Sequence, residues 1–314
     1  MTGAVSDLAV RVGGLALRNP FLLASGIWGE SGASLAGAWR AGAGGVVTKS
    51  IGSGPRPGYP NPTVETYGSW GLLNAMGLPN PGIHEYPQEI RIALDAGATV
   101  VGSIFGGDAA EFATLARAME ATGVQALELN LSCPHAEGFG TEIGSEPDDV
   151  EEIVRAVVRE VRLPVIAKIT PNAADPAGLA VAAERAGAAA VSAINTLRAI
   201  AIDTTLRRPV LAHGIGGLSG PAIKPVGLAC VWQMFERVRI PIVGVGGIST
   251  PEDALEYVMA GARALEVGTA ITFAGIGVFG GLVTGLDHRL DQLGYARVED
   301  AVGVAHETTR ASAR

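Results

Sequence analysis

Residues 126–135 read Ala-Leu-Glu-Leu-Asn-Leu-Ser-Cys-Pro-His, an apolar run that ends in polar side chains and a cysteine. The two-residue period of a strand places Asn130 and Ser132 on one face and the intervening leucines on the other. Pro134 cannot continue a central strand, so Cys133 is predicted to lie where the sheet becomes a loop. Enzymes built on β/α barrels keep their chemistry at such strand ends. A free cysteine is also a common buried apolar side chain, so this stretch alone leaves both interpretations open.

Seven further apolar runs occur along the chain, with helix-like segments between them. The eight runs span residues 21–25, 45–50, 99–105, 126–132, 164–170, 190–195, 241–247 and 264–270. Most are uniformly apolar, as expected of strands covered on both faces of a parallel sheet. The alternation predicts an α/β fold, a (β/α)8 TIM barrel that forms a single domain over residues 1–314. A doubly wound open sheet is the alternative, but no Gly-x-Gly-x-x-Gly motif follows the first run.

The connections between the runs differ in kind. Residues 147–161 and Pro251–Ala260 have the amphipathic pattern of helices, and the second follows a Ser-Thr cap. Segments 52–92 and 195–240 are too long for plain connectors, so they are predicted to be functional loops over the C-terminal mouth of the barrel. Residues 8–17, with a Gly-Gly pair in the middle, predict a hairpin that plugs the other end.

Composition narrows the class of protein. Hydrophobic residues make up 48% of the 314 and charged residues 17%, which allows a large core. The net charge of −8 without a basic cluster argues against nucleic acid or an anionic membrane as a partner. Two cysteines supply neither a disulfide framework nor the ligands of an iron–sulfur cluster. With no signal peptide pattern and no apolar stretch of membrane-spanning length, we expect a soluble cytoplasmic protein.

Paired glycine motifs end the last two runs. Gly246-Gly247 follows the seventh and Gly268-Thr269 the eighth. Glycine lets backbone N–H groups approach a ligand closely, and barrels commonly bind phosphate at these two loops. Tight packing between strand and helix is the alternative explanation. We interpret the pair of motifs as the site of a phosphate monoester.

Two lysines lie at or near strand ends in apolar runs, where an unpaired ammonium would be costly to bury. Lys49 and Lys168 could each form a Schiff base, or hold an anion or an electron-rich cofactor. Asn74, Asn130 and Asn195 are also predicted at this mouth. Their amides both donate and accept hydrogen bonds, which suits a planar ring of alternating C=O and N–H groups.

Other polar residues give weaker signals. His84, His135 and His213 lack the spacing of metal ligands, so no metal site is assigned. Cys230 lies in an apolar helical segment and is interpreted as core packing.

With these residues in view, the chain resembles the class 1 dihydroorotate dehydrogenases, flavin enzymes of pyrimidine synthesis. The likeness runs from about Leu8 to Ala270 and rests on residues 19–20, 24–26, 47–50, 73–80, 128–134, 194–196, 216–225, 246–248 and 268–269. Membrane-bound class 2 enzymes carry a serine base and an N-terminal extension, whereas this chain has a cysteine and its first barrel strand begins near Phe21. Residues 136–144 resemble the catalytic subunit of the NAD-linked heteromeric type.

The resemblance implies FMN-dependent oxidation of (S)-dihydroorotate to orotate in de novo pyrimidine (UMP) biosynthesis, with hydride transfer to FMN. It assigns Cys133 as the catalytic base and Lys49 as a second catalytic residue. The implied FMN-binding residues are Ser25, Lys49, Ser50, Ser103, Asn130, Lys168, Ile194, Gly220, Gly246, Gly247, Gly268 and Thr269. The implied substrate-binding residues are Lys49, Asn74, Ala75, Met76, Gly77, Leu78, Asn130, Asn195 and Thr196. Ser103 stands where many relatives have an asparagine.

Alternatives for the activity stay open at this point. Cys133-Pro134-His135 also occurs in dihydropyrimidine dehydrogenases, so the chain could act on uracil or thymine, and His135 could contact the substrate. A Schiff-base lyase and a barrel that binds a phosphorylated metabolite without redox chemistry are further hypotheses.

The resemblance also implies partners. The chain shows no nicotinamide fingerprint and too few cysteines for a cluster of its own. By resemblance, the NAD-linked type passes electrons to a second subunit that carries FAD and an iron–sulfur cluster. A barrel that works alone with fumarate or a quinone is the alternative. We expect a small-molecule substrate and a homo-oligomeric core, a dimer.

Overall fold

The computed structural model describes residues 6–132 and 144–307. Within them, parallel strands form a closed barrel: β3 (Phe21–Leu23), β4 (Gly45–Val47), β7 (Val100–Ile104), β8 (Ala126–Asn130), β9 (Val165–Ile169), β10 (Ala190–Ala193), β15 (Ile242–Val245) and β16 (Ala262–Val267). Each strand pairs with the next barrel strand along the chain, and β16 closes the barrel against β3. The predicted (β/α)8 barrel is confirmed, and the open sheet is wrong.

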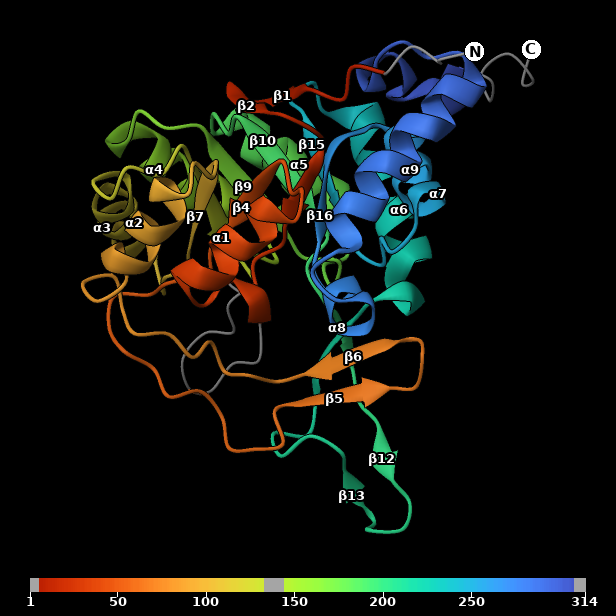
Figure 1. The fold of residues 1–314 in the computed structure, drawn as a ribbon. Coiled ribbons are helices and arrows are strands. Elements are labelled where there is room, and N and C mark those ends of the chain that lie inside the picture. Colours follow the sequence, from red (N-terminus) through yellow and green to blue (C-terminus); the bar gives the residue numbers. More distant parts are fainter. Residues whose placement is uncertain (1–5, 133–143, 308–314) are drawn as a thin grey trace.

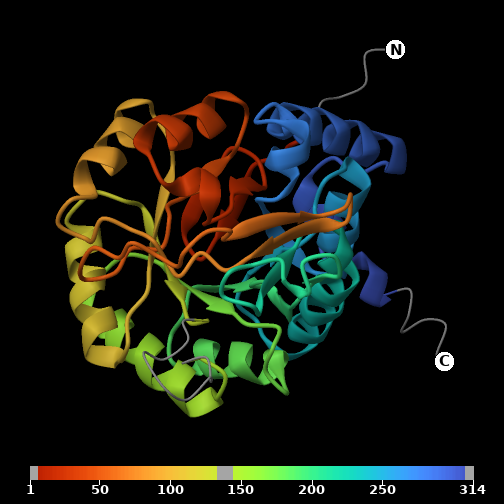
Figure 2. The ribbon, with the colours of Figure 1, turned by 90° about the horizontal axis from the view of Figure 1, so that it is seen from below.

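Helices form a ring around the barrel (Figure 2). They are α1 (Gly32–Arg40), α2 (Pro87–Asp95), α3 (Ala109–Glu120), α4 (Pro147–Glu160), α5 (Pro176–Arg185), α6 (Lys224–Arg237), α7 (Pro251–Ala260), α8 (Ala270–Ala274) and α9 (Val278–Leu293), with short 3-10 turns η1 (Ile27–Gly29), η2 (Pro221–Ile223) and η3 (Val298–Ala301). Helix α7 begins at the predicted residue, because Thr250 and Asp253 form a reciprocal capping box. None of the described helices is both long and apolar enough to cross a membrane.

Most barrel strands end earlier than the sequence predicted. The first run was expected to end at residue 25 and the second at residue 50, but β3 ends at Leu23 and β4 at Val47. The polar residues that follow are therefore loop residues at the mouth. Thr48, Lys49 and Ser50 are buried although they lie outside β4, so burial continues past the strand and the sequence pattern placed the strand ends too late.

The N-terminal hairpin lies at the end of the barrel opposite β5 and β6 (Figure 1). Strands β1 (Val10–Val12) and β2 (Leu15–Leu17) pair antiparallel, and in each strand two buried apolar side chains flank an exposed residue. Gly13 has φ 55°, and a Cβ there would meet the Ala189 carbonyl oxygen at 2.6 Å. Ala189 precedes β10, so the hairpin packs against the N-terminal end of the barrel, as predicted.

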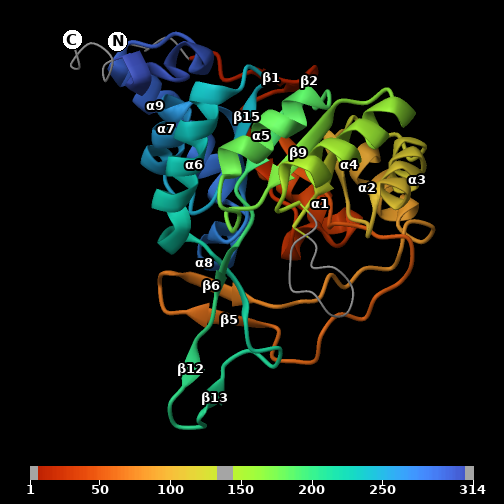
Figure 3. The same cartoon turned by 180° about the vertical axis from the view of Figure 1, so that it is seen from behind.

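The two long insertions build a sheet rather than plain loops. Strands β5 (Val64–Tyr67), β6 (Gly71–Asn74), β11 (Leu197–Ala199) and β14 (Gly216–Ser219) pair in the order β11-β14-β6-β5. The hairpin of β12 (Ile202–Asp203) and β13 (Arg208–Pro209) extends beyond them (Figure 3). The predicted loops also contain the first part of the barrel helix α2 and all of α6, so the loop boundaries were too wide. Their predicted position over the C-terminal mouth is confirmed (Figures 1 and 2).

Candidate active site

A cavity of about 900 Å³ lies at the C-terminal mouth, between the barrel strands and the four-stranded sheet. Its volume falls in the range of ligand and cofactor pockets. Almost all site residues predicted from the sequence line it: Ser25, Lys49, Ser50, Asn74, Ala75, Met76, Gly77, Leu78, Asn130, Lys168, Ile194, Asn195, Thr196, Gly220, Gly246, Gly247, Gly268 and Thr269. The fold thus gathers strand ends and insertion residues that are far apart in the sequence.

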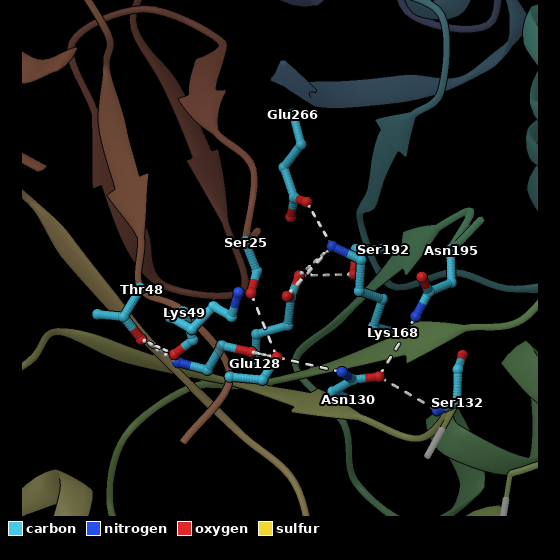
Figure 4. A network of polar contacts seen from close by, with 12 residues as sticks. Ser25, Thr48, Lys49, Glu128, Asn130, Ser132, Lys168, Ser192, Asn195 and Glu266 are labelled. Carbon is cyan, nitrogen blue, oxygen red and sulfur yellow. Dashed lines mark hydrogen bonds and ion pairs between the residues drawn. The ribbon is translucent and has the colours of Figure 1, made fainter. Parts of the chain in front are cut away.

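A chain of hydrogen bonds connects four strand ends around the mouth (Figure 4). The hydroxyls of Ser25 and Ser50 lie 3.2 Å apart. Asn130 Nδ2 donates to Ser50 Oγ at 3.1 Å, and Asn195 Nδ2 donates to Asn130 Oδ1 at 3.3 Å. These contacts fix the amides in one orientation, so the rim presents a set pattern of donors and acceptors to a planar ligand.

Lys49 is almost fully buried, but it has a carboxylate partner. Its Nζ lies 3.1 Å from Glu30 Oε1, and its side chain is 7% exposed against 52% for Glu30. The same Nζ is 3.8 Å from the sulfur of Met76, which belongs to the loop that leaves β6. An ammonium between a half-exposed carboxylate and the cavity is available to an anionic ligand, because Glu30 can turn to solvent.

The loop from Asn74 to Leu78 forms the wall contributed by the first insertion. Asn74 Nδ2 donates to the Gly217 carbonyl at 3.1 Å, which joins this wall to the second insertion. Gly77 and Leu78 both have positive φ, 74° and 54°. Such a conformation is uncommon for leucine and costs backbone energy, and it occurs most often at ligand-binding loops.

Glycines form a cradle opposite this wall. Gly246 and Gly247 have φ 122° and 73°, and a Cβ on Gly247 would come within 2.8 Å of Lys224 Cβ and 2.9 Å of the Gly220 carbonyl oxygen. Thr269 Oγ1 donates to the Ser219 hydroxyl at 2.8 Å. Backbone that no side chain can cover suits a ligand group that accepts N–H hydrogen bonds, such as a phosphate. The cradle therefore fits the predicted phosphate site.

At the floor of the cavity lies a group of buried polar side chains, here called the buried cluster: Glu128, Lys168, Ser192 and Glu266 (Figure 4). Lys168 Nζ lies 2.7 Å from Glu266 Oε2 and 3.3 Å from Glu128 Oε1. The Ser192 hydroxyl donates to Glu128 Oε2 at 2.9 Å. The three ionisable side chains are at most 7% exposed, and Lys168 and Glu266 line the cavity.

Two carboxylates share one ammonium in this cluster, and these charges shift the pKa values of Lys168 and Glu266. Burial lowers the pKa of Lys168, but the negative charges of Glu128 and Glu266 outweigh that effect and raise it above its ordinary value. Burial and the charge of Glu128 raise the pKa of Glu266 to about 8. Lys168 therefore stays protonated, which disfavours its use as a Schiff-base nucleophile, since that role needs the neutral amine.

Among the described residues, Ser103 is the predicted site residue that does not line the cavity. Cys133 and His135 lie outside the described residues. Ser103 is fully buried and touches the cavity wall indirectly, through a 2.9 Å contact between its hydroxyl and that of Ser50. Ser132, next to Cys133, lines the cavity, and its buried Oγ has no hydrogen-bond partner among residues 6–132 and 144–307. An unpaired buried hydroxyl is costly unless a ligand completes it.

His213 and Cys230 have clear positions in the structure. His213 stacks on Tyr59 with ring centroids 3.9 Å apart, and both line the mouth of the cavity. Over residues 6–132 and 144–307, no three His, Cys, Asp or Glu side chains gather as a metal site would require. Cys230 is buried in α6, as predicted.

Sequence reasoning missed part of the site. Glu128, Ser192 and Glu266 were not singled out, although two of them are carboxylates inside otherwise apolar strands. Such a carboxylate needs a buried cation, so Leu127-Glu128-Leu129 and Leu265-Glu266-Val267 carried a usable signal. Other lining residues that were missed are Trp28, Arg56, Asn172 and Arg198.

A closed parallel barrel with a polar cavity at its C-terminal mouth defines a (β/α)8-barrel enzyme. The sequence profile of the dihydroorotate dehydrogenase family matches residues 7–290. A protein of Thermoplasma acidophilum named "Dihydroorotate dehydrogenase B (NAD(+)), catalytic subunit" is 47% identical over 96% of this chain and 99% of its own length. Proteins with the same name from Pyrococcus abyssi (48% identity, 95% and 99%) and Methanocaldococcus jannaschii (46%, 96% and 98%) are similar in the same way.

The chain belongs to the dihydroorotate dehydrogenase family, whose members are flavin-dependent oxidoreductases. The resemblance to class 1 enzymes drawn from the sequence is thereby confirmed.

Proposed function

We propose that this chain oxidises (S)-dihydroorotate to orotate with FMN as the bound oxidant, as the catalytic subunit of an NAD-linked enzyme of pyrimidine synthesis. The observation that carries the proposal is the cavity itself. It combines a glycine cradle, a buried lysine and a rim of oriented amides within one space of about 900 Å³. That is room for a planar cofactor with a phosphate tail and a small planar substrate beside it.

The cofactor side of the cavity would be the glycine cradle and the barrel floor. Gly246, Gly247, Gly268 and Thr269 would hold the phosphate through their backbone, and Lys168 would stand at the ring. When bound, FMN supplies a two-electron oxidant for the C6 hydrogen of the substrate. Lys168 keeps its positive charge at neutral pH, since both neighbouring carboxylates raise its pKa. A fixed positive charge at the floor favours a cofactor that becomes more negative on reduction.

The substrate side would be the amide rim and Lys49. The carboxylate of dihydroorotate is an anion, and the Lys49 ammonium would bind it in place of Glu30, which is half exposed. Asn74, Asn130 and Asn195 would orient the ring through its C=O and N–H groups, because their amides are already held by hydrogen bonds.

Cys133 would remove the C5 proton of the substrate. It directly follows Ser132, which lines the cavity. A free thiol has a pKa of about 8.5, so the thiolate forms on the alkaline side of neutrality. Substrate oxidation should therefore become faster as the pH rises towards that value.

The reaction is tested by anaerobic stopped-flow absorbance of the FMN-loaded protein. Dihydroorotate should bleach the flavin band, and Cys133→Ala should slow bleaching by roughly 10²-fold or more while FMN binding is kept. Wild-type rates in Cys133→Ala would show that another group is the base. Faster bleaching by dihydrouracil than by dihydroorotate would favour the dihydropyrimidine dehydrogenase alternative.

The electron acceptor would be a second subunit that carries FAD and an iron–sulfur cluster. The supporting observation is that the similar proteins are named catalytic subunits of NAD(+) enzymes. In this proposal residues 1–314 form one FMN-binding barrel domain that assembles as a dimer. The isolated chain should then reduce a dye with dihydroorotate but not NAD. Steady NAD reduction or rapid turnover with fumarate by the isolated chain would contradict the partner.

A further inference from the structure

The buried cluster contains one carboxylate more than its single ammonium can neutralise. Glu128 lies on β8, Lys168 on β9 and Glu266 on β16, and all three meet inside the barrel. The register neighbours of Glu266 are Val245 on β15 and Leu22 on β3, both apolar. The strands packed against Glu266 therefore bring no further charge to it at these positions. Like charges held this close in a low-dielectric interior favour uptake of a proton by one of them.

The two carboxyls are not equivalent. Glu128 accepts a hydrogen bond from the Ser192 hydroxyl in addition to its contact with Lys168. Within residues 6–132 and 144–307, the hydrogen-bond donor to Glu266 is Lys168 Nζ, at 2.7 Å. Because Glu128 has the extra donor, Glu266 is the carboxyl of the pair that takes up a proton more readily.

Glu266 also faces the cavity, so its charge acts on whatever binds there. It lines the cavity together with Lys168, while its side chain is only 2% exposed. Little water therefore separates Glu266 from a bound ligand, so a change in the charge of the ligand interacts strongly with the Glu266 carboxyl.

We propose that Glu266 is a positioning residue that takes up one proton at its carboxyl group when the bound flavin is reduced. The inference rests on the proposed function, since it needs FMN in the cavity. When dihydroorotate is oxidised, its C6 hydrogen would leave as a hydride and its C5 proton would pass to the base. The hydride would add one negative charge to the cofactor. The Glu266 carboxylate then binds a proton from solvent, with no bond made or broken besides that O–H. Lys168 is left with one carboxylate and is free to face the cofactor.

Glu266 is therefore expected to change how the flavin potential depends on pH. For a two-electron couple, each proton taken up contributes about 30 mV per pH unit. Reduction of the flavin raises the proton affinity of Glu266. The extra proton is therefore taken up only at pH values at which Glu266 is deprotonated while the flavin is oxidised. The raised pKa of about 8 places the start of that range on the alkaline side.

The experiment is a spectroelectrochemical titration of the FMN-loaded protein between pH 7 and 10. The wild-type slope should steepen from about 30 towards about 60 mV per pH unit above pH 8, and Glu266→Gln should keep about 30 throughout. Glu256→Gln is the matched control, because Glu256 also shares a lysine with a second carboxylate but lies at the surface. It should behave as wild type.

A second readout needs no variant to fold. The reduced-minus-oxidised infrared spectrum of the wild type at pH 9 should gain a protonated carboxyl band. A constant wild-type slope, the absence of that band, or steepening retained in Glu266→Gln would overturn the proposal. FMN content is measured first: a protein that takes up no FMN contradicts the proposed function, whereas FMN bound with a constant slope contradicts this inference alone.

Discussion

Two lysines of this protein each lie between two carboxylates, yet the two groups behave differently. One is Lys168 of the buried cluster. The other group, here called the surface cluster, consists of Lys224, Asp253 and Glu256. The distances from Nζ to oxygen are alike, 2.7 and 3.3 Å in the buried cluster and 2.6 and 3.1 Å in the surface cluster.

The pKa values of Asp253 in the surface cluster and of Glu266 in the buried cluster are shifted in opposite directions. Burial raises the pKa of Asp253, but the hydrogen bond from Lys224 and the backbone N–H groups of Ser249 and Thr250 outweigh it, so the net shift is downward. For Glu266, burial and the charge of Glu128 prevail, and its pKa rises to about 8. Backbone N–H donors and nearby solvent thus determine the direction in which the pKa shifts when two carboxyl groups share one lysine. The surface cluster connects α6 to α7 through ion pairs, whereas Glu266 of the buried cluster is the group proposed to exchange a proton.

The largest difference is expected on removing each ammonium. Lys168→Met leaves two buried carboxylates without a cation, which should lower the free energy of unfolding by about 3–5 kcal/mol. Lys224→Met should cost no more than about 1 kcal/mol, because the surface cluster is partly solvated. Urea unfolding of the FMN-free proteins at pH 7 measures both. Equal losses would show that burial does not separate the two clusters.

The two acids should also give opposite pH dependences of stability. Folded Glu266 binds its proton more tightly than unfolded Glu266, so its contribution is present below the unfolded pKa of about 4.5 and is lost as the pH rises through about 8. Over that range the slope approaches 1.4 kcal/mol per pH unit at most, about the value of one pKa unit. Between pH 5 and 8, the free energy of unfolding should change less with pH in Glu266→Gln than in the wild type.

Asp253 provides the reverse case. Its lowered pKa adds stability above the unfolded pKa, and this is lost as the pH falls through the folded pKa. Asp253→Asn should therefore reduce stability at pH 7 and weaken its loss in acid. If Glu266→Gln and Asp253→Asn changed the pH dependence of the unfolding free energy in the same direction, the opposite pKa shifts of the two residues would be contradicted.

A smaller effect is expected for the hydroxyl that supports Glu128. Ser192→Ala removes a buried donor 2.9 Å from a carboxylate, which should cost about 1.5–3 kcal/mol. Ser53→Ala removes the same kind of bond, to Glu111 at 2.6 Å, but on the exposed surface. We expect that control to stay within about 0.5 kcal/mol of wild type. An unchanged free energy of unfolding in Ser192→Ala would mean that the hydrogen bond from Ser192 to Glu128 does not stabilise the fold.

The smallest difference concerns salt. The coupling between Lys224 and Glu256, measured by a double-mutant cycle, should be below about 1 kcal/mol and should vanish in 1 M NaCl. The coupling between Lys168 and Glu266 should persist, because counterions do not reach a side chain that is 2% exposed. Salt sensitivity of the second coupling would indicate that water and ions enter the cluster.

The sequence predicted the barrel well, because each strand and helix carries its own local signal. The capping residues before Pro251 located α7, and the glycines after two runs located the cradle. The sheet formed by the insertions was missed. Strands β6 and β14 are short and rich in polar residues and glycine, and they pair across more than 140 positions of sequence. Local periodicity cannot report such a pairing.

The buried cluster shows the same limit within the site. Lys168 was predicted as a functional residue, but its carboxylate partners were not. Lys168 on β9 reaches Glu266 on β16, although β10 and β15 separate these strands around the barrel. Two side chains that meet across a barrel interior have no fixed spacing in the sequence. The roles of Cys133 and His135 stay predictions.

The central claim is that the cavity holds FMN with its phosphate on the glycine cradle. Equilibrium titration of the flavin-free protein with FMN and with riboflavin, followed by fluorescence, tests it most directly. The account predicts about one FMN bound per chain and riboflavin bound at least about tenfold more weakly, a difference of about 1.4 kcal/mol, because riboflavin lacks the phosphate. Equal affinity for the two flavins, or no uptake of FMN, would contradict it.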